Sequence, residues 1–209
     1  MYYRKSFAIS LLGTLPLLLG CANASAGANS QAQSRPDLTK FPVDQGPVMR
    51  AAHAILMGQQ AEQKADASAL HTAAQVLQSL GAKPDMDQED DLSSRWASQA
   101  KSIEPATEPS VYRGRALGPS YKKGMVSALS TVNIEQIFLA GKKASVALVP
   151  VSSKPMSIRI SDGQGKNICN RSTSSKPANC EWLPLFTERY RINIHTSATQ
   201  PLTYYLVSN

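Results

Sequence analysis

The pattern of hydrophobic and polar positions changes near residue 110. Before that point, over residues 46–105, apolar residues recur three and four positions apart, which predicts short amphipathic helices. After it, over residues 111–209, apolar and polar residues alternate in short runs, which predicts strands with one buried face. The change of period predicts a helical segment followed by a β module.

We expect three helices in the first part. Pro47 suits the first turn of the first helix. Asp66 can cap the start of the second helix, and Gly81 can end it. The third is expected after Pro84 and before Pro105. The three apolar faces comprise Val48, Ala51, Ala52, Ile55 and Leu56; Leu70, Ala73, Ala74, Leu77 and Leu80; and Leu92, Trp96, Ala100 and Ile103. Helices this short need partners, so we expect them to pack on each other or on the C-terminal module.

The alternating pattern over residues 111–209 predicts many short strands separated by turns. The clearest turn sequences are 162–165, Asp-Gly-Gln-Gly, and 152–155, Ser-Ser-Lys-Pro. The fold class is therefore α+β, with an antiparallel, jelly-roll-like β-sandwich after the helices. The alternating residues are Ile134, Gln136 and Phe138; Ala144, Val146 and Leu148; Met156, Ile158 and Ile160; Tyr190, Ile192 and Ile194; and Tyr204 and Leu206.

The N-terminus has the order of a secretory signal peptide. Arg4 and Lys5 precede a short uncharged apolar stretch, and small residues follow it. The apolar stretch is shorter than the roughly 20 residues that span a bilayer. We therefore expect residues 1–26 to direct export, and residues 27–45, rich in Ala, Ser, Gln and Asn, to form a flexible tether.

Two modes of signal cleavage remain open. Ala22-Asn23-Ala24 and Ala24-Ser25-Ala26 both fit ordinary cleavage, whereas residues 18–21, Leu-Leu-Gly-Cys, resemble a bacterial lipobox in which Cys21 is lipidated. The first mode gives a periplasmic or secreted protein. The second gives a lipoprotein, for example of the outer membrane, held through its lipid anchor.

Cys169 and Cys180 remain in the mature chain in either case. An exported chain meets an oxidising compartment, so we expect this pair to form a disulfide. A metal site is disfavoured because no histidine lies between the two cysteines.

Charge differs between the two parts. Residues 35–110 hold seven Lys and Arg against eleven Asp and Glu, whereas residues 111–209 hold thirteen against four, a net charge of +9. The basic part could bind an anionic envelope polymer or lipid. Its charges are dispersed, which favours an ordinary solvated surface, and export disfavours nucleic acid as a partner.

The second part carries several loose motifs in a fixed order: Phe138, Ala140, Gly141, Ala144 and Val146; Asp162, Gly165 and Cys169; Cys180, Trp182, Pro184, Phe186, Thr187, Tyr190, Ile192 and Ile194; and Tyr204, Tyr205 and Asn209. The order and spacing of these motifs resemble those of the bacterial pre-peptidase C-terminal domain. That resemblance implies a non-catalytic β-sandwich that assists targeting, folding or binding. Some relatives carry an Asp-rich stretch that suggests calcium, but residues 152–157 hold no carboxylate here, so we expect no metal.

No pattern of an active site is evident in the sequence. His53, His71 and His195 lack the spacing of a zinc protease, and no Gly-x-Ser-x-Gly marks a nucleophilic serine. The acidic run 85–91 lacks the glycine and the terminal glutamate of an EF-hand loop, so we interpret it as the acidic start of a helix. We expect no enzyme activity and no cofactor.

Aromatic residues offer an alternative function, glycan binding. Trp182, Tyr190, Tyr204 and Tyr205 could form a platform for a sugar, although Trp182 beside a disulfide is expected to pack on the core. Tyr204 and Tyr205 are neighbours on one strand, so one of them is expected to be exposed.

The sequence thus favours an exported, non-catalytic protein that binds an envelope protein or envelope polymer. The alternative is a module that binds an anionic glycan or lipid, and an enzyme with an unfamiliar site is a distant third hypothesis. Membrane contact is expected only through a lipid on Cys21.

Overall fold

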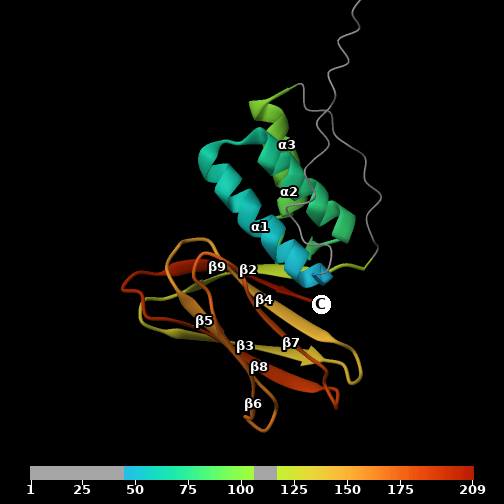
Figure 1. Cartoon of the computed structure of the whole chain (residues 1–209), viewed down its shortest axis with the longest axis vertical. Helices are drawn as coiled ribbons and strands as arrows, with labels where there is room; N and C mark the ends of the chain where they lie inside the picture. Colours follow the sequence, from blue (N-terminus) through green and yellow to red (C-terminus); the bar gives the residue numbers. More distant parts are fainter. Residues whose placement is uncertain (1–44, 106–116) are drawn as a thin grey trace, which may run out of the picture. The chain divides into compact units, whose positions relative to one another are not determined.

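The computed structural model describes residues 45–105 and 117–209, all of which lie in one compact unit. Three helices come first and two β-sheets follow, which confirms the α+β class and the β-sandwich (Figure 1). The predicted signal, residues 1–26, and Cys21 lie outside the described residues, as does all but the last residue of the predicted tether, residues 27–45. No described helix has the length and hydropathy needed to cross a membrane.

The helices begin and end at the residues that cap them. Pro47 occupies the first turn of α1, Asp66 accepts a hydrogen bond from the Ala69 amide at the start of α2, and Gly81 ends α2 with a positive φ. The third helix starts later than predicted, because Asp91 rather than Pro84 sets its first turn. The bounds are Pro47–Lys64 for α1, Ala67–Leu80 for α2 and Leu92–Ile103 for α3.

Two sheets form the sandwich. The first has the strand order β1-β2-β9-β4-β7 and the second β3-β8-β5-β6, and all neighbouring strands are antiparallel except β1 and β2. The bounds are Lys83–Pro84 (β1), Ser120–Val126 (β2), Thr131–Phe138 (β3), Ala144–Pro150 (β4), Met156–Ser161 (β5), Asn167–Ser172 (β6), Ala178–Trp182 (β7), Glu188–Thr196 (β8) and Leu202–Ser208 (β9).

One core fills the space between the sheets. Apart from Ile134, which is half-buried, and Gln136, every alternating residue named from the sequence is buried there. Gln136 donates a hydrogen bond to the Ser208 hydroxyl at 3.0 Å. Cys169 on β6 and Cys180 on β7 form the disulfide that the sequence predicts, and it joins the two sheets at one edge.

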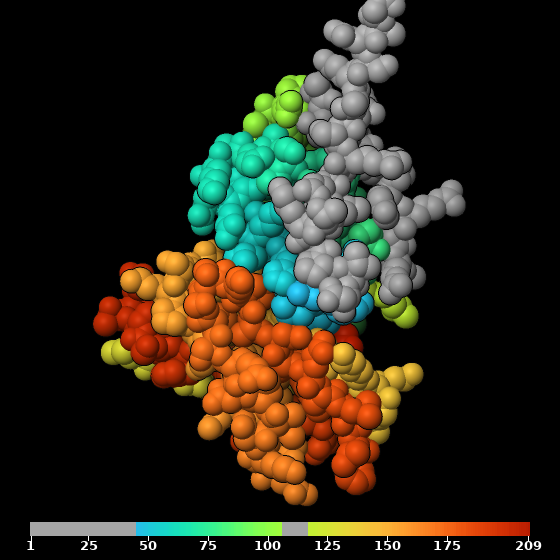
Figure 2. Space-filling view, in the orientation of Figure 1, coloured from blue at the N-terminus to red at the C-terminus, as the bar shows by residue number. Residues whose placement is uncertain are grey.

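A second core lies on the outer face of the first sheet, where the helices pack (Figures 1 and 2). Ala147 and Val149 of β4, and Tyr205 and Val207 of β9, point toward the helices, while their chain neighbours point into the sandwich. Two expectations were therefore wrong. Tyr204 and Tyr205 are both buried, at 3% and 1% exposure, because both faces of β9 are covered. Ile103 is exposed, since it lies in the last turn of α3, beyond the part of that helix that packs.

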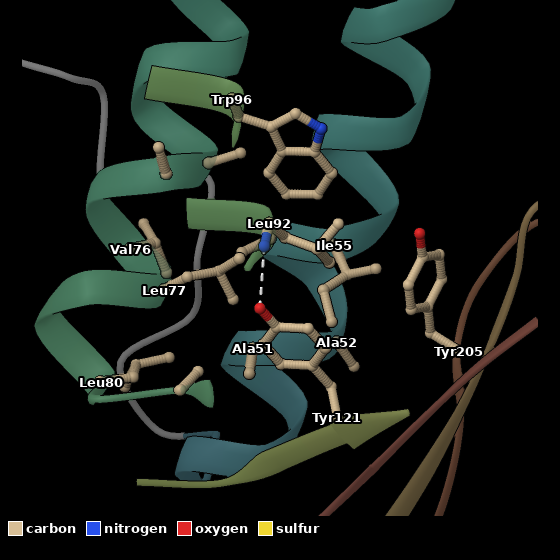
Figure 3. Packing of buried hydrophobic residues seen from close by; sticks show 14 of the residues in the cluster. Ala51, Ala52, Ile55, Val76, Leu77, Leu80, Leu92, Trp96, Tyr121 and Tyr205 are labelled. Atoms are coloured by element: carbon tan, nitrogen blue, oxygen red, sulfur yellow. Dashed lines mark hydrogen bonds between the residues drawn. The ribbon is translucent and has the colours of Figure 1, made fainter. Parts of the chain in front are cut away.

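Trp96 is the largest fully buried side chain of the second core, where it lies close to α1 (Figure 3). It fits because Gly58 of α1 has no side chain, and a Cβ there would overlap the six-membered ring of Trp96. The close approach of α1 and α3 therefore depends on a glycine inside a helix.

Gly58→Ala is expected to lower the free energy of unfolding by about 1–3 kcal/mol, the usual cost of overpacking a core. Helix propensity alone predicts the opposite sign, a gain of about 1 kcal/mol. Urea unfolding measures the difference. Gln60→Ala, at an exposed position of α1, serves as the control and should change stability little. A Gly58→Ala variant as stable as the parent chain would contradict the packing described.

Candidate functional site

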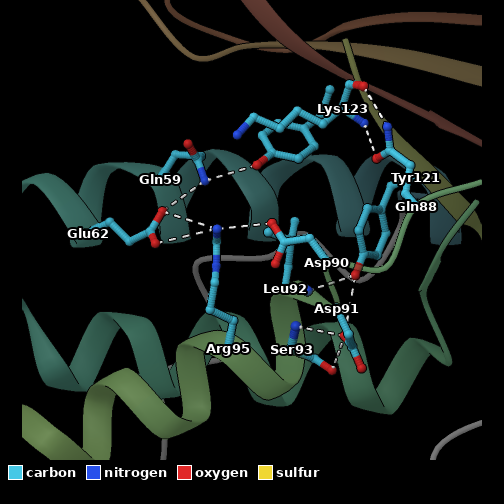
Figure 4. A network of polar contacts seen from close by, with 11 residues as sticks. Gln59, Glu62, Gln88, Asp90, Asp91, Leu92, Ser93, Arg95, Tyr121 and Lys123 are labelled. Atoms are coloured by element: carbon cyan, nitrogen blue, oxygen red, sulfur yellow. Dashed lines mark hydrogen bonds and ion pairs between the residues drawn. The ribbon is translucent and has the colours of Figure 1, made fainter.

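The acidic run 85–91 forms a loop that is joined to β2 by side-chain contacts. Asp85 and Asp87 form ion pairs with Lys122. Gln88 donates to the Lys123 carbonyl and accepts from the Lys123 amide, both at 2.8 Å (Figure 4). Interpreting the whole run as a helix start was therefore wrong, because the described helix begins only at Leu92.

Only the last residue of this run caps a helix. Asp91 accepts hydrogen bonds from the backbone amide of Ser93 at 3.0 Å and from its hydroxyl at 2.8 Å. Burial acts to raise the pKa of Asp91, but the hydrogen bonds from Ser93 and Ser94 outweigh it and the pKa is lowered. The carboxylate is thus held in its charged form at the positive end of α3.

Tyr121 of β2 is hydrogen-bonded to the start of α3 and so joins the sheet to the helices. Its hydroxyl accepts a hydrogen bond from the Leu92 amide at 2.9 Å and donates to Asp91 at 3.3 Å (Figures 3 and 4). The side chain is 1% exposed, and burial raises the pKa of Tyr121 well above its ordinary value. The hydroxyl therefore stays neutral and holds the first turn of α3 against β2.

A groove of about 540 Å³ lies beside this loop. Its lining includes Gln88, Asp90, Lys123, Met125 and Tyr205. Gln88 is hydrogen-bonded to β2, and Asp90 forms an ion pair with Arg95, which also contacts Glu62. The polar groups at this groove thus serve to join the loop and the helices to the sheet, which makes it a structural feature.

The three histidines lie on three different elements. His53 is on α1, His71 on α2 and His195 on β8, where it is exposed and hydrogen-bonded to Thr131. Burial lowers the pKa of His53 and of His71, which favours the neutral form of both rings. Within residues 45–105 and 117–209, no three His, Cys, Asp or Glu side chains are grouped to hold a metal.

The aromatic residues proposed for sugar binding are used in packing. Tyr190 is 3% exposed, and Trp182 is half-buried against Phe138, with ring centroids 4.8 Å apart. Tyr190 completes the cluster, 5.2 Å from Trp182 and 5.8 Å from Phe138. With Tyr204 and Tyr205 also buried, these side chains form no open platform.

The two loops that follow Phe138 and Trp182 expose large apolar side chains at one end of the sandwich. One loop, 139–143, joins β3 to β4, and the other, 183–187, joins β7 to β8. We call them together the apolar end. Its exposed members are Leu139 (57%), Leu183 (60%), Leu185 (80%) and Phe186 (72%). A cluster of exposed apolar side chains on a folded protein usually marks a site of interaction.

Hydrogen bonds hold the two loops together. The Gly141 amide donates to the Pro184 carbonyl at 2.9 Å, and the Ala140 amide donates to the Thr187 hydroxyl at 3.0 Å. Gly141 has a φ of +68°, which other residues rarely adopt. Asn209 adds a third contact, because its side-chain amide donates to the Lys143 carbonyl at 2.7 Å. The apolar end is therefore preorganised.

Sequence analysis did not identify the apolar end as a site. Phe186 and Pro184 had been noted only as residues that match the pre-peptidase C-terminal domain. The available signal was the run Leu183-Pro184-Leu185-Phe186 between two strands, since three large apolar residues are unusual in a turn.

Comparisons with known proteins find similar folds only. No family model matches the chain, and no curated protein matches its sequence. Solved structures with a similar sandwich include PliG, a periplasmic inhibitor of g-type lysozyme from Aeromonas hydrophila, at 16% identity over 44% of this chain and 84% of that one, with a TM-score of 0.35. The pre-peptidase C-terminal domain of a Bacillus anthracis collagenase is 12% identical over 42% of this chain and 87% of that one, with a TM-score of 0.34.

A third similar structure is FlgD of Xanthomonas campestris, a protein of flagellar hook capping. It is 15% identical over 40% of this chain and 68% of that one, with a TM-score of 0.25. Structural similarity at TM-scores this low does not indicate function. The structure confirms the β-sandwich that the resemblance to the pre-peptidase C-terminal domain implies, and the resemblance itself stays a prediction.

Tyr121→Phe is expected to lower the free energy of unfolding by about 1–3 kcal/mol, because it leaves the buried Leu92 amide without its acceptor. Urea unfolding measures the change. Tyr204→Phe is the matched control, since within the described part of the chain no hydrogen bond of the Tyr204 hydroxyl is found. Equal effects of the two substitutions would show that the network beside the groove contributes nothing to stability.

Proposed function

We propose that this chain is a non-catalytic, exported binding module that holds a component of the cell envelope through its apolar end. The observation that carries the proposal is the exposure of four large apolar side chains on two loops that are fixed to each other. Burying such side chains against a partner contributes favourable free energy in proportion to the area removed from water. The predicted signal peptide and the disulfide support export.

The part of the sandwich next to the apolar end is also tightly packed. Phe138, Trp182 and Tyr190 form an aromatic cluster beneath the apolar end, in which Phe138 meets the other two rings edge-to-face. The disulfide partner Cys180 lies two residues before Trp182 on β7. A preorganised surface loses little conformational entropy on binding, which favours a role in recognition.

Capture of a polyanion by charge alone is less well supported. Several basic side chains of the sandwich already pair with acids: Lys122 with Asp85 and Asp87, Lys143 with Glu181, and Arg189 with Glu135. The net charge of +9 over residues 111–209 is therefore spread over the surface and partly neutralised locally. The proposed binding is led by apolar contact.

A photoreactive amino acid at position 186 is expected to crosslink the exported chain to an envelope component in living cells. The product is detected as a mass shift and identified by mass spectrometry, with lipid adducts included in the search. Position 175, exposed in the turn between β6 and β7 at the far end of the sandwich, is the matched control. Labelling that is absent at 186, or equal at both positions, would overturn the proposal.

A further inference from the structure

The two loops of the apolar end differ from the rest of the sandwich in composition. Their ten residues are Leu-Ala-Gly-Lys-Lys, 139–143, and Leu-Pro-Leu-Phe-Thr, 183–187. They contain four exposed large apolar side chains, two lysines and no acidic residue. Leucine and phenylalanine beside lysine is the composition of surfaces that lie in the interfacial region of a bilayer.

The apolar side chains are presented on loop tips, where they can enter a soft partner. Leu185 and Phe186 lie mid-loop and are the most exposed of the group, at 80% and 72%. Pro184, by contrast, is buried, and its carbonyl accepts the hydrogen bond from Gly141. The loop is thus anchored at Pro184 and projects its next two side chains into solvent. Side chains that project from a surface can insert between lipid headgroups without a preformed pocket.

Lysines lie at the border of the projecting side chains. Lys142 is exposed, and Lys143 pairs with Glu181 at 2.8 Å while remaining 67% exposed. A lysine beside an inserted apolar group can keep its ammonium at the level of the lipid phosphates while its methylene chain lies in the apolar region. Lysine near an anionic membrane surface adds attraction that salt screens.

The first helix, α1, also begins at this end of the sandwich. Gly46 precedes α1, and a Cβ at Gly46 would lie 3.7 Å from the carboxylate of Glu181, the residue that pairs with Lys143. The start of α1 therefore lies on the same side of the sandwich as the apolar end. A lipid on Cys21 would hold the chain near a bilayer. Stable attachment through lipidation commonly needs such a second membrane contact.

From these observations we propose that the apolar end binds the surface of an anionic phospholipid bilayer, with Leu185 and Phe186 inserted and Lys142 at the headgroup phosphates. This inference rests on the proposed function, because it names the partner of the same surface. The bilayer accounts for two features together: the projecting apolar tips, and the presence of lysine without acid across the two loops.

The test uses the exported chain with Cys21→Ser, purified from cells, so that no lipid on residue 21 contributes to binding. Co-sedimentation is measured with vesicles of phosphatidylethanolamine and phosphatidylglycerol, and with vesicles of phosphatidylcholine alone. We expect binding to the anionic vesicles, weaker binding to the neutral ones, and at least a tenfold loss with the double variant Leu185→Ser, Phe186→Ser. Lys142→Glu should weaken binding to the anionic vesicles and leave binding to the neutral ones nearly unchanged.

Leu129→Ser is the matched control, because Leu129 is 65% exposed in the turn at the other end of β3. It should change vesicle binding less than twofold. Thermal unfolding of each variant checks that the exposed substitutions leave the fold intact. Absence of binding to anionic vesicles, or equal losses with Leu129→Ser and with the double variant, would overturn the inference.

The vesicle and crosslinking experiments separate the two proposals. A chain that ignores vesicles but crosslinks from position 186 to one protein would refute the bilayer as partner and retain the binding function. A chain that ignores vesicles and crosslinks to nothing from position 186 would refute both.

Discussion

The structure depends on one sheet that is buried on both faces. Along β4 and β9, alternate side chains enter two different cores: Val146 and Leu148 pack between the sheets, while Ala147 and Val149 pack beneath the helices. Every residue of β4 is therefore buried. The helices thus complete the first sheet, because without them Tyr205 and Val207 would face water. Tyr121 and Gly58 then fix how α3 and α1 fit into this layer.

The alternating pattern was enough to predict the sandwich but not the helical layer over it. Residues such as Ile158, Ile192 and Leu206 revealed one buried face, and all three line the core between the sheets. The apolar run 146–150 at the end of β4 is the sign of a strand covered on both sides, and an alternating pattern does not predict it. The same omission led to the expectation that Tyr204 or Tyr205 would be exposed. The late start of α3 escaped prediction because the contacts of the acidic loop are made with β2, far away in sequence.

The apolar end could not be predicted from the sequence for a different reason. Catalytic and metal-binding residues have sequence patterns, whereas the proposed surface is made of leucine and phenylalanine. Such residues reveal a site only when their exposure is known, and exposure here depends on how two loops 40 residues apart in sequence meet through Gly141 and Pro184. Because the helices cover one face of the first sheet and the second sheet covers the other, the loops at the ends of its strands are where apolar side chains can remain accessible.

In the proposed function, the chain engages the envelope through the apolar end while the rest of the fold serves as a rigid support. Hydrogen–deuterium exchange, compared between the chain bound to isolated envelopes and the chain purified in solution, measures which surface is covered. Added protection on binding is expected only in peptides covering 139–143 and 183–187. Protection centred instead on the groove at Gln88 and Lys123, with those two loops unchanged, would contradict it.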